Sequence, residues 1–334
     1  MIRGLRLEAT PGDEGLRLDR FLLARLGGAP RAFVAEAIAR GGVRVRGAAA
    51  AKGRRLAAGD VVEVDAWPEP ADLGAQPDPR AALAVVFEDA DLVVVDKPGG
   101  CPSHPLRPGE TGTLANALAA RFPETVGAGD APLMAGLAHR LDAGTSGLLA
   151  AARTRAAFEN LRRQFAGRRV AKGYLALARG GAAAAGCAED WLSHDPALRG
   201  RMLVRPTAGA SGAERALRAV TEYEPLGSAG GLALLRVRIR TGVTHQIRAQ
   251  LAARGHAIVG DARYGPPAES PLPAGRHFLH AGHLAFGHPR TGEPLEFRCP
   301  LPDDLRRVLE GLDPALVERA DAAWGGGTSG RPAA

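Results

Sequence analysis

A turn near the middle of the chain brings together side chains that could do chemistry. The segment H-R-L-D-A-G-T-S-G begins at His139 and contains one carboxylate, Asp142. A basic residue, Arg140, and a hydroxyl, Thr145, lie beside it. Such loops often carry catalytic groups, because the rigid elements around them hold their polar side chains in place. The alternative is a capping turn, in which Asp142 or Thr145 only bonds backbone N–H groups. Other motifs in the chain favour a catalytic turn over a capping turn.

Three further segments place polar residues at or near strand-like apolar runs. Lys97 follows one such run and precedes a Pro-Gly turn, so we expect a surface lysine at a strand exit. Tyr174 lies in the strand-like segment 170–177, and a core tyrosine with a hydrogen-bonded hydroxyl is the alternative for it. The segment 241–248, T-G-V-T-H-Q-I-R, follows an alternating strand that carries arginines on one face.

Three histidines near the end of the chain suggest a metal site, which their spacing disfavours. His277, His280 and His283 are three residues apart, and neither a helix nor a strand directs all three side chains to one point. No carboxylate or cysteine stands at ligand spacing. We therefore expect structural histidines and no metal; a zinc hydrolase is the alternative that metal analysis would test.

The composition indicates a globular protein with a polyanionic partner. The chain has 334 residues, which favours two domains, and a formal net charge of +7. Positive charge favours nucleic acid, because neutralising phosphates supplies most non-specific affinity. Three widely separated cysteines fit a reducing compartment, and no segment has the apolar length of a signal or membrane helix. We expect a cytoplasmic protein with no membrane attachment.

The chain is predicted to contain a small module, a linker, a larger domain and a tail. Helical spacing followed by two alternating strands predicts a compact module over residues 15–66. Prolines without an apolar period predict a linker over 67–80. The larger domain is expected over 81–312, and a disordered tail over 325–334.

The small module is densely basic and resembles a known RNA-binding unit. Its R-L-D-x-F-L opening at Arg17, two-helix turn and V-x-V-x-G strand are similar to the module first seen in the fourth protein of the small ribosomal subunit. A solvated basic face is the alternative. If the resemblance holds, RNA contacts are expected from Arg31, Arg44, Arg46, Lys52 and Arg54.

Five blocks in order resemble the RluA-type pseudouridine synthases. They are D-K-P-G-G with a later H-P, H-R-L-D-x-x-T-S-G-L-L, K-x-Y-L-A, T-G-x-T-H-Q-I-R with G-H-x-I-V-G-D-x-x-Y-G, and L-H-A-x-x-L-A-F-G-H-P. The resemblance covers about residues 84 to 302. It implies an α+β fold with a mixed, mostly antiparallel sheet and a central cleft, and an isomerase that converts uridine in RNA to pseudouridine without a cofactor.

The resemblance also implies roles for individual residues. Asp142 matches the catalytic aspartate, which would attack the ribose or the uracil ring or assist departure of the base. Tyr174 matches a tyrosine that stacks near the base and could shuttle a proton, and Arg248 matches the arginine paired with the catalytic carboxylate. Arg140 matches a residue that fills the gap left by the extruded base. Substrate contacts are expected from Arg140, His139, Thr145, His245 and Gln246.

The sequence also suggests which class of RNA is the substrate and which arginines bind its phosphates. The basic module favours ribosomal RNA of the large subunit over transfer RNA, and we expect a monomer. We also expect Arg236 and Arg238 to line the cleft and bind phosphates. Val243 stands where the family usually has arginine, which predicts a modest loss of affinity for RNA. The alternative is a non-catalytic RNA-binding or ribosome-assembly protein.

Overall fold

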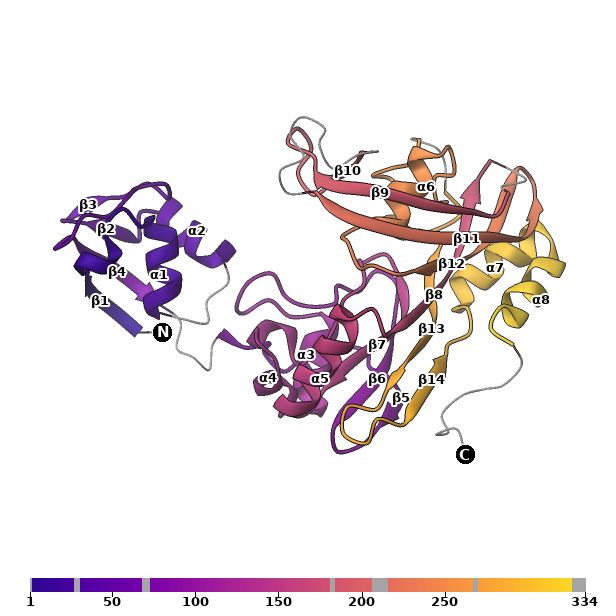
Figure 1. Cartoon of the computed structure of the whole chain (residues 1–334), viewed down its shortest axis with the longest axis horizontal. Helices are drawn as coiled ribbons and strands as arrows, with labels where there is room; N and C mark the ends of the chain where they lie inside the picture. Colours follow the sequence, from indigo (N-terminus) through magenta and orange to yellow (C-terminus); the bar gives the residue numbers. More distant parts are fainter. Residues whose placement is uncertain are drawn as a thin grey trace. The chain divides into compact units, whose positions relative to one another are not determined.

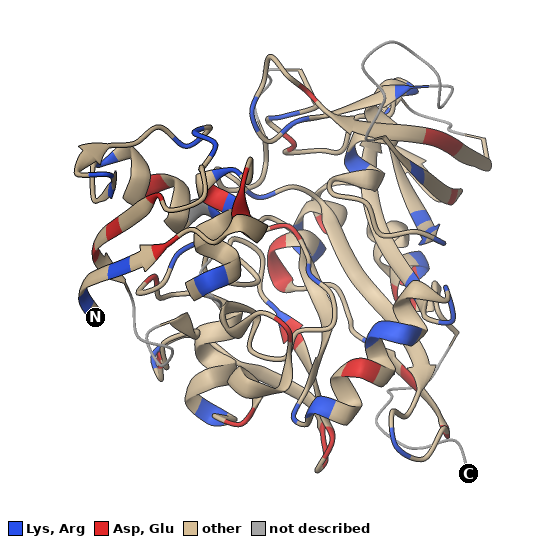
Figure 2. Cartoon of the chain, turned by 60° about the vertical axis from the view of Figure 1, so that its left-hand side comes forward, with Lys and Arg blue, Asp and Glu red and all other residues tan. Residues whose placement is uncertain are grey.

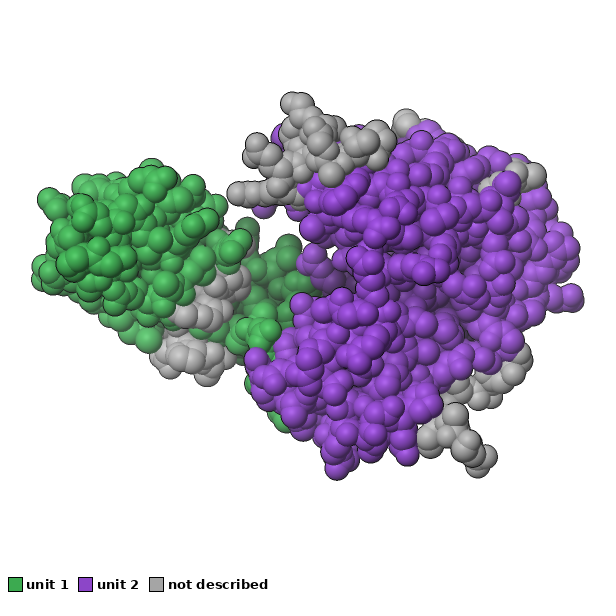
Figure 3. Space-filling model, in the orientation of Figure 1, with its two compact units in different colours: residues 1–81, 104–137 green, residues 82–103, 138–334 purple. Residues whose placement is uncertain are grey.

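The fold was analysed in a computed structural model that describes residues 2–26, 31–67, 73–180, 184–205, 216–266 and 270–325. These residues form two compact units (Figure 3). Unit 1 comprises residues 1–81 and 104–137, and unit 2 comprises residues 82–103 and 138–334. None of the described helices is long and apolar enough to cross a membrane. Arginines and lysines occur in both units among acidic residues (Figure 2).

Unit 1 contains a four-stranded antiparallel sheet in the order β1-β4-β2-β3 (Figure 1). The sheet begins at Ile2, N-terminal to the predicted module start at residue 15, because β1 pairs along β4. The helices α1 and α2 have the positions that helical spacing predicts, and Phe21 and Trp67 belong to the core between helices and sheet. The elements are β1 (Ile2–Glu8), η1 (Pro11–Asp13), α1 (Leu18–Leu26), α2 (Arg31–Ala39), β2 (Val43–Val45), β3 (Ala48–Ala49) and β4 (Val61–Trp67).

A second part of unit 1 comes from residues 104–137. It contains α3 (Leu114–Arg121), α4 (Thr125–Ala128) and η3 (Pro132–Met134). Asn116 donates from Nδ2 to the Gln76 carbonyl at 2.7 Å, so the described end of the predicted 67–80 linker packs against α3. Residues 68–72 of that linker and residues 326–334 of the predicted tail lie outside the described residues.

Unit 2 is a ten-stranded sheet with helices, which confirms the predicted α+β fold. The strand order is β10-β9-β11-β12-β8-β13-β7-β6-β5, with β14 paired to β13. All neighbouring pairs are antiparallel except β13 and β7, which confirms a mixed, mostly antiparallel sheet. The first strands are β5 (Ala84–Glu88), β6 (Leu92–Lys97), β7 (Ser146–Ala152), β8 (Ala171–Arg179) and β9 (Gly186–His194). The others are β10 (Met202–Arg205), β11 (Leu217–Ala229), β12 (Leu232–Ile239), β13 (Leu279–Gly287) and β14 (Pro294–Arg298).

Helices cover both faces of this sheet (Figure 1). Helix α6 contacts β9, β10 and β11, whereas α8 contacts β11 and packs beside α7. The apolar face of α5 packs on β7, where Phe158 and Leu161 join the core around Leu148 and Ala150. The helices are α5 (Arg155–Ala166), α6 (Gln246–Ala253), α7 (Asp303–Leu312) and α8 (Pro314–Ala322).

The parallel pair of β7 and β13 depends on a glycine that directly follows the Asp142 turn. Gly147 has φ +114°, and a Cβ there would lie 2.3 Å from the Ala281 carbonyl oxygen. Ala281 is its register partner on β13. Only glycine gives both the left-handed backbone and this close approach of two strands.

We predict that Gly147→Ala lowers the free energy of unfolding by about 3 kcal/mol or more, because it adds a backbone clash to the cost of a positive φ. Gly231→Ala is the matched control: Gly231 has φ +74° and open space around it. That control should lose only about 1 kcal/mol. Denaturant unfolding of both variants measures the difference; equal losses would show that the close approach of the strands is not needed.

Candidate active site

Buried cations bond the carbonyl oxygens of the Asp142 turn and hold the turn in place. Asp142 lies four residues before β7, every residue of which is buried. Lys97 Nζ donates to the Ala143 carbonyl at 3.2 Å, and Arg276 Nη1 donates to the Gly144 carbonyl. The Gly100 N–H also donates to the Ala143 carbonyl, at 2.8 Å. The backbone on the C-terminal side of Asp142 is therefore fixed by several donors.

Lys97 was expected on the surface, and this expectation is wrong. Its side chain is fully buried, and Nζ also donates to the carbonyls of Pro98 at 2.8 Å and Cys101 at 2.7 Å. Burial lowers the pKa of Lys97 to about 8. The Pro-Gly turn folds back over the ammonium group, so that three carbonyl oxygens replace its water shell.

Asp142, Arg248 and Asp261 form a chain of ion pairs. Arg248 Nη1 donates to Asp142 Oδ2 at 2.7 Å. Its Nε and Nη2 donate to the two oxygens of Asp261 at 2.7 and 2.9 Å. The Asp261 side chain is fully buried and that of Arg248 is 9% exposed, whereas that of Asp142 is 26% exposed. The bidentate bond fixes the guanidinium plane, and this plane directs one N–H at the accessible carboxylate.

The buried carboxylate of Asp261 is held charged by Arg248. Burial alone would raise the pKa of Asp261, but the hydrogen bonds and charge of Arg248 outweigh it, so this pKa lies below its usual value. The pKa of Arg248 is raised, because both carboxylates outweigh the effect of its own burial. The cation therefore stays protonated throughout the physiological range.

Tyr174 points to the same region from β8. The residue is 6% exposed, and burial first, then the negative charge of Asp142, raises the pKa of its phenol. The phenol is therefore protonated at neutral pH and can donate a hydrogen bond but cannot act as a tyrosinate base. An apolar strand, a flat ring and a nearby carboxylate together form a site that can take up a planar, polar ring such as a base.

His245 and Tyr264 complete the surroundings of Asp142. His245 Nε2 lies 3.9 Å from Asp142 Oδ1, and His245 Nδ1 lies 2.9 Å from the Tyr264 hydroxyl. That hydroxyl accepts the Met202 N–H at 2.8 Å, so its own proton is free to donate to Nδ1. In this arrangement the imidazole carries its hydrogen on Nε2, facing the carboxylate. The pKa of His245 is lowered, mainly by burial.

Comparison with known proteins matches this site to one family. Residues 91–253 match the RNA pseudouridylate synthase family. An RNA pseudouridine synthase of Chloroflexus aurantiacus is 40% identical, over 90% of this chain and 92% of that protein. The ribosomal large subunit pseudouridine synthase D of Nitrosomonas europaea is 34% identical, over 92% of this chain and 88% of that protein. The chain belongs to the RNA pseudouridylate synthase family.

A solved structure shares the fold. Human RNA pseudouridylate synthase domain containing 1 superposes with a TM-score of 0.54 and 26% identity, over 77% of this chain and all of that chain. The protein is accordingly an RNA pseudouridine synthase, an isomerase that acts on uridine in RNA.

Several residues predicted to contact substrate in this synthase are engaged inside unit 2. The His139 imidazole accepts the Ala150 N–H at Nε2 at 3.1 Å, and burial lowers its pKa to about 3, so it is neutral. The Thr145 hydroxyl is buried and lies 2.8 Å from His277 Nε2. Gln246 is buried and bonds Val220, Thr221, Thr241 and Val243. These three support the turns, whereas the side chain of the exposed Arg140 bonds, among the described residues, only the Thr244 hydroxyl, at 3.2 Å.

The expectation that Arg236 and Arg238 line the site is wrong. In the register of β12 with β8, Val237 lies opposite Tyr174, so Val237 and Tyr174 share a face of the sheet. Arg236 and Arg238 point to the other face, where they lie opposite Glu224 and Glu222 of β11. Arg236 bonds Glu224 and also the Ala323 carbonyl at the end of α8. Carboxylates and a helix end occupy this face.

The predicted RNA-binding residues of unit 1 differ in their surroundings. Arg44 forms ion pairs with Glu63 and Asp65, and both Arg46 and Arg54 lie beside Asp60. Arg31 and Lys52 are exposed. The RNA-binding role of this face stays a prediction.

The three histidines of the metal hypothesis have different partners. His277 bonds Thr145, His280 bonds Ser146 and the Cys299 carbonyl, and His283 bonds Glu296. Their imidazoles therefore do not share a centre.

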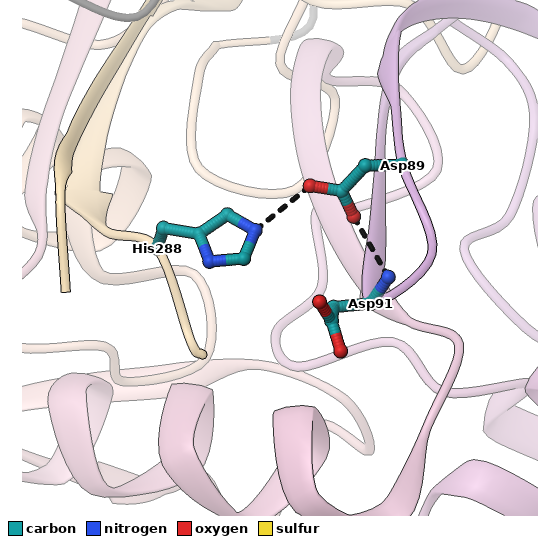
Figure 4. Close-up of side chains that lie close together, drawn as sticks. All are labelled: Asp89, Asp91 and His288. Carbon is teal, nitrogen blue, oxygen red and sulfur yellow. Dashed lines mark hydrogen bonds and ion pairs between the residues drawn. The ribbon is translucent and has the colours of Figure 1, made fainter. Parts of the chain in front are cut away.

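Asp89, Asp91 and His288 do lie close together (Figure 4). His288 Nε2 bonds Asp89 at 2.8 Å, while His288 Nδ1 accepts two backbone N–H groups. Arg290 pairs with Asp91 at 2.6 Å. Protein groups thus bond His288 and Asp89, the charge of Arg290 faces Asp91, and the cluster joins the β5–β6 and β13–β14 turns.

Two important residues were quoted in sequence motifs without a role being assigned to them. Asp261 and Tyr264 belong to the G-D-x-x-Y-G motif, which follows α6. Arg276 belongs to none of the sequence motifs, and as a buried arginine before a strand it needs several acceptors. Its guanidinium bonds the Gly144 carbonyl, the Ser146 hydroxyl and Asp304.

We predict that Asp261→Asn destabilises the fold and changes its acid sensitivity. Leaving Arg248 without its buried partner should cost about 3–5 kcal/mol at pH 7. Because the folded pKa of Asp261 is depressed, its contribution is full above the unfolded pKa of about 4 and is lost as the pH falls through the folded pKa. The variant should therefore lose less stability between pH 5 and 3 than the wild type.

Denaturant unfolding followed by circular dichroism at each pH measures both effects. Asp321→Asn is the matched control, because Asp321 pairs with Arg306 at an exposed site. It should cost at most about 1 kcal/mol. Equal unfolding free energies for the two variants would contradict a structural role for the Asp261 pair.

Proposed function

We propose that this synthase modifies uridines of large-subunit ribosomal RNA and that Asp142 is its reacting group. The observation that carries the proposal is the accessible Asp142 carboxylate, with one oxygen bonded to a fixed arginine. Among the relatives, the Nitrosomonas europaea protein is named for the large ribosomal subunit and aligns over nearly the whole chain. A basic N-terminal unit supports a large RNA substrate. The cytoplasmic location and the monomeric state stay predictions.

The isomerisation makes specific demands on the site. The C1′–N1 bond breaks and a C1′–C5 bond forms; C5 loses its proton and N1 gains one. The reaction therefore needs a group that interacts with the ribose or the ring and a group that accepts a proton. A carboxylate can do both, and Asp142 presents its Oδ1 while Arg248 holds its Oδ2.

Tyr174 and His245 supply donors around this carboxylate. The protonated Tyr174 phenol can stack on the base and donate to it, and His245 presents an N–H to Oδ1 in the arrangement set by Tyr264. Neither group offers an atom that can take up a proton: the Tyr174 phenol keeps its own proton at neutral pH because its pKa is raised, and in the His245 imidazole Nδ1 accepts from the Tyr264 hydroxyl while Nε2 carries the hydrogen. We therefore assign proton acceptance from C5 to Asp142.

Arg140 is placed to fill the space that the uridine leaves in the RNA stack. It is exposed and bonds the Thr244 hydroxyl, so its guanidinium lies two residues from Asp142 and beside the His245 turn. A uridine must leave its stack to reach Asp142, at a cost of a few kcal/mol. A flat guanidinium can stack in the space that the base leaves.

We predict that Asp142→Asn abolishes pseudouridine formation and leaves RNA affinity within about threefold, since one exposed charge near RNA is lost. The measurement compares pseudouridine maps of cellular RNA from a strain that lacks the gene, complemented with the wild type or with Asp142→Asn. Sites in large-subunit RNA should return only with the wild type. Restoration by Asp142→Asn would refute the catalytic assignment, and sites confined to transfer RNA would refute the target.

We predict that Tyr174→Phe lowers the single-turnover rate on the order of 10²-fold, because the ring is kept and the donor is lost. RNA affinity should stay unchanged. Tyr174→Leu, which also removes the stacking surface, should be slower still. A wild-type rate for the Phe variant would show that the hydroxyl takes no part in the reaction.

A further inference from the structure

The strands β9 and β10, the turn 195–201 between them and Arg263, which bonds that turn, are together called the arm. The arm carries arginines that have no carboxylate partner among the described residues. Two exposed arginines of the neighbouring strands have carboxylate partners: Arg218 pairs with Glu189 at 2.6 Å, and Arg240 pairs with Glu222 at 2.7 Å. In the described part of the chain, no ion pair is formed by Arg199, Arg201 or Arg263.

Arg201 has a donor that no protein acceptor satisfies. Its Nε is buried and makes no hydrogen bond within the described residues. A buried donor without an acceptor is costly. An oxyanion brought by a ligand would remove the cost, and guanidinium groups match phosphate geometry.

These arginines lie beside the catalytic ion pair. The Arg201 guanidinium lies 5.8 Å from the centre of the Tyr264 ring, and that of Arg248 lies 5.3 Å from the same ring. Arg201 and the cation that holds Asp142 thus both lie against the same aromatic ring. Arg263 follows in the same motif, and its charge reaches His245, where it adds to the effects of burial and Arg248 that lower the imidazole pKa.

The arm is fixed in position before any ligand binds. Met202 donates its N–H to the Tyr264 hydroxyl, and its side chain packs with Leu192, Ala219 and Ala249. Val243, in the turn before α6, packs against this same apolar cluster.

The turn of the arm is held by a second arginine contact. Arg263 Nη1 bonds the Arg199 carbonyl at 3.1 Å across Gly200, which has φ +79° and no side chain in the way. A cationic surface on a fixed support loses little entropy on binding.

We propose that Arg199, Arg201 and Arg263 bind backbone phosphates of the RNA strand next to the uridine that enters the site. A flipped nucleotide leaves its flanking phosphates within reach of the pocket rim, and phosphates are the anions that this substrate brings there. This inference rests on the proposed function, because it takes RNA as the ligand. An acidic protein surface is the competing partner.

The test measures the salt dependence of RNA binding by the full chain. The probe is a transcript of the large-subunit ribosomal RNA of the source organism, titrated between 50 and 200 mM salt, a range in which phosphate contacts are lost measurably. The variants are Arg199→Gln, Arg201→Gln, Arg263→Gln and the triple variant. Arg218→Gln on the neighbouring β11 is the matched control, because it is exposed and already paired.

Each arm variant should weaken binding on the order of tenfold and reduce the slope of log affinity against log salt by about 0.7 to 1. The loss should appear mainly in the rate at low RNA concentration, that is, in kcat/KM. Arg218→Gln should stay within about twofold of the wild type, as an exposed paired charge allows. Circular dichroism and thermal unfolding check that the variants are folded.

Wild-type affinity and salt slope in the triple variant would overturn the inference and favour the protein partner. Pseudouridine formation by the wild type in the same transcript reports separately on the proposed function. If the wild type modifies only another RNA, the target proposal fails, and the same slopes measured on that RNA decide the role of the arm.

Discussion

The bond from Arg248 to Asp142 is the interaction on which the site depends. It joins a turn before β7 to helix α6, more than a hundred residues apart in the chain. Burying an unpaired guanidinium would cost much free energy, so the bond to Asp142 depends on the bidentate bond from Arg248 to the fully buried Asp261. The result is one carboxylate that is buried and one that is accessible, both held by a single guanidinium.

The backbone around Asp142 is fixed by a different principle. Here buried cations bond carbonyl oxygens rather than carboxylates: Lys97 bonds Ala143, and Arg276 bonds Gly144. Glycines make room for these contacts, because a Cβ on Gly99 would lie 2.4 Å from Arg276 Nε. With its turn held on two sides, Asp142 loses little freedom when the substrate binds, which is how a site lowers the entropic cost of a reaction.

Much of the fold and the centre of the site could be predicted from the sequence. Periodicity located α1 and the strands β5 and β6, because local apolar patterns determine such elements. Asp142, Tyr174 and Arg248 were identified from motifs, and the structure brings them together. The face of β12 could not be predicted, because the register with β8 decides whether Arg236 or Val237 lies beside Tyr174.

Buried polar roles were harder to foresee for a related physical reason. A lysine before Pro-Gly usually lies in water, and only the folded turn reveals three carbonyls around Lys97. The same holds for Thr145 and Gln246, whose polar groups bond partners distant in sequence. A motif can identify the residues of a site, but long-range contacts decide which of them face the substrate and which support it.

The most direct test of the account uses large-subunit ribosomal RNA labelled with tritium at C5 of uridine. Isomerisation must release this label to water, so single-turnover release measures the chemical step itself. Purified wild type should release the label from its target sites, and Asp142→Asn should release none. Folded Asp261→Asn should release the label slowly, because it keeps the reacting carboxylate but loses the bond that orients Arg248. Release by Asp142→Asn at the wild-type rate, with equal RNA bound, would contradict the assignment of Asp142 as the reacting group.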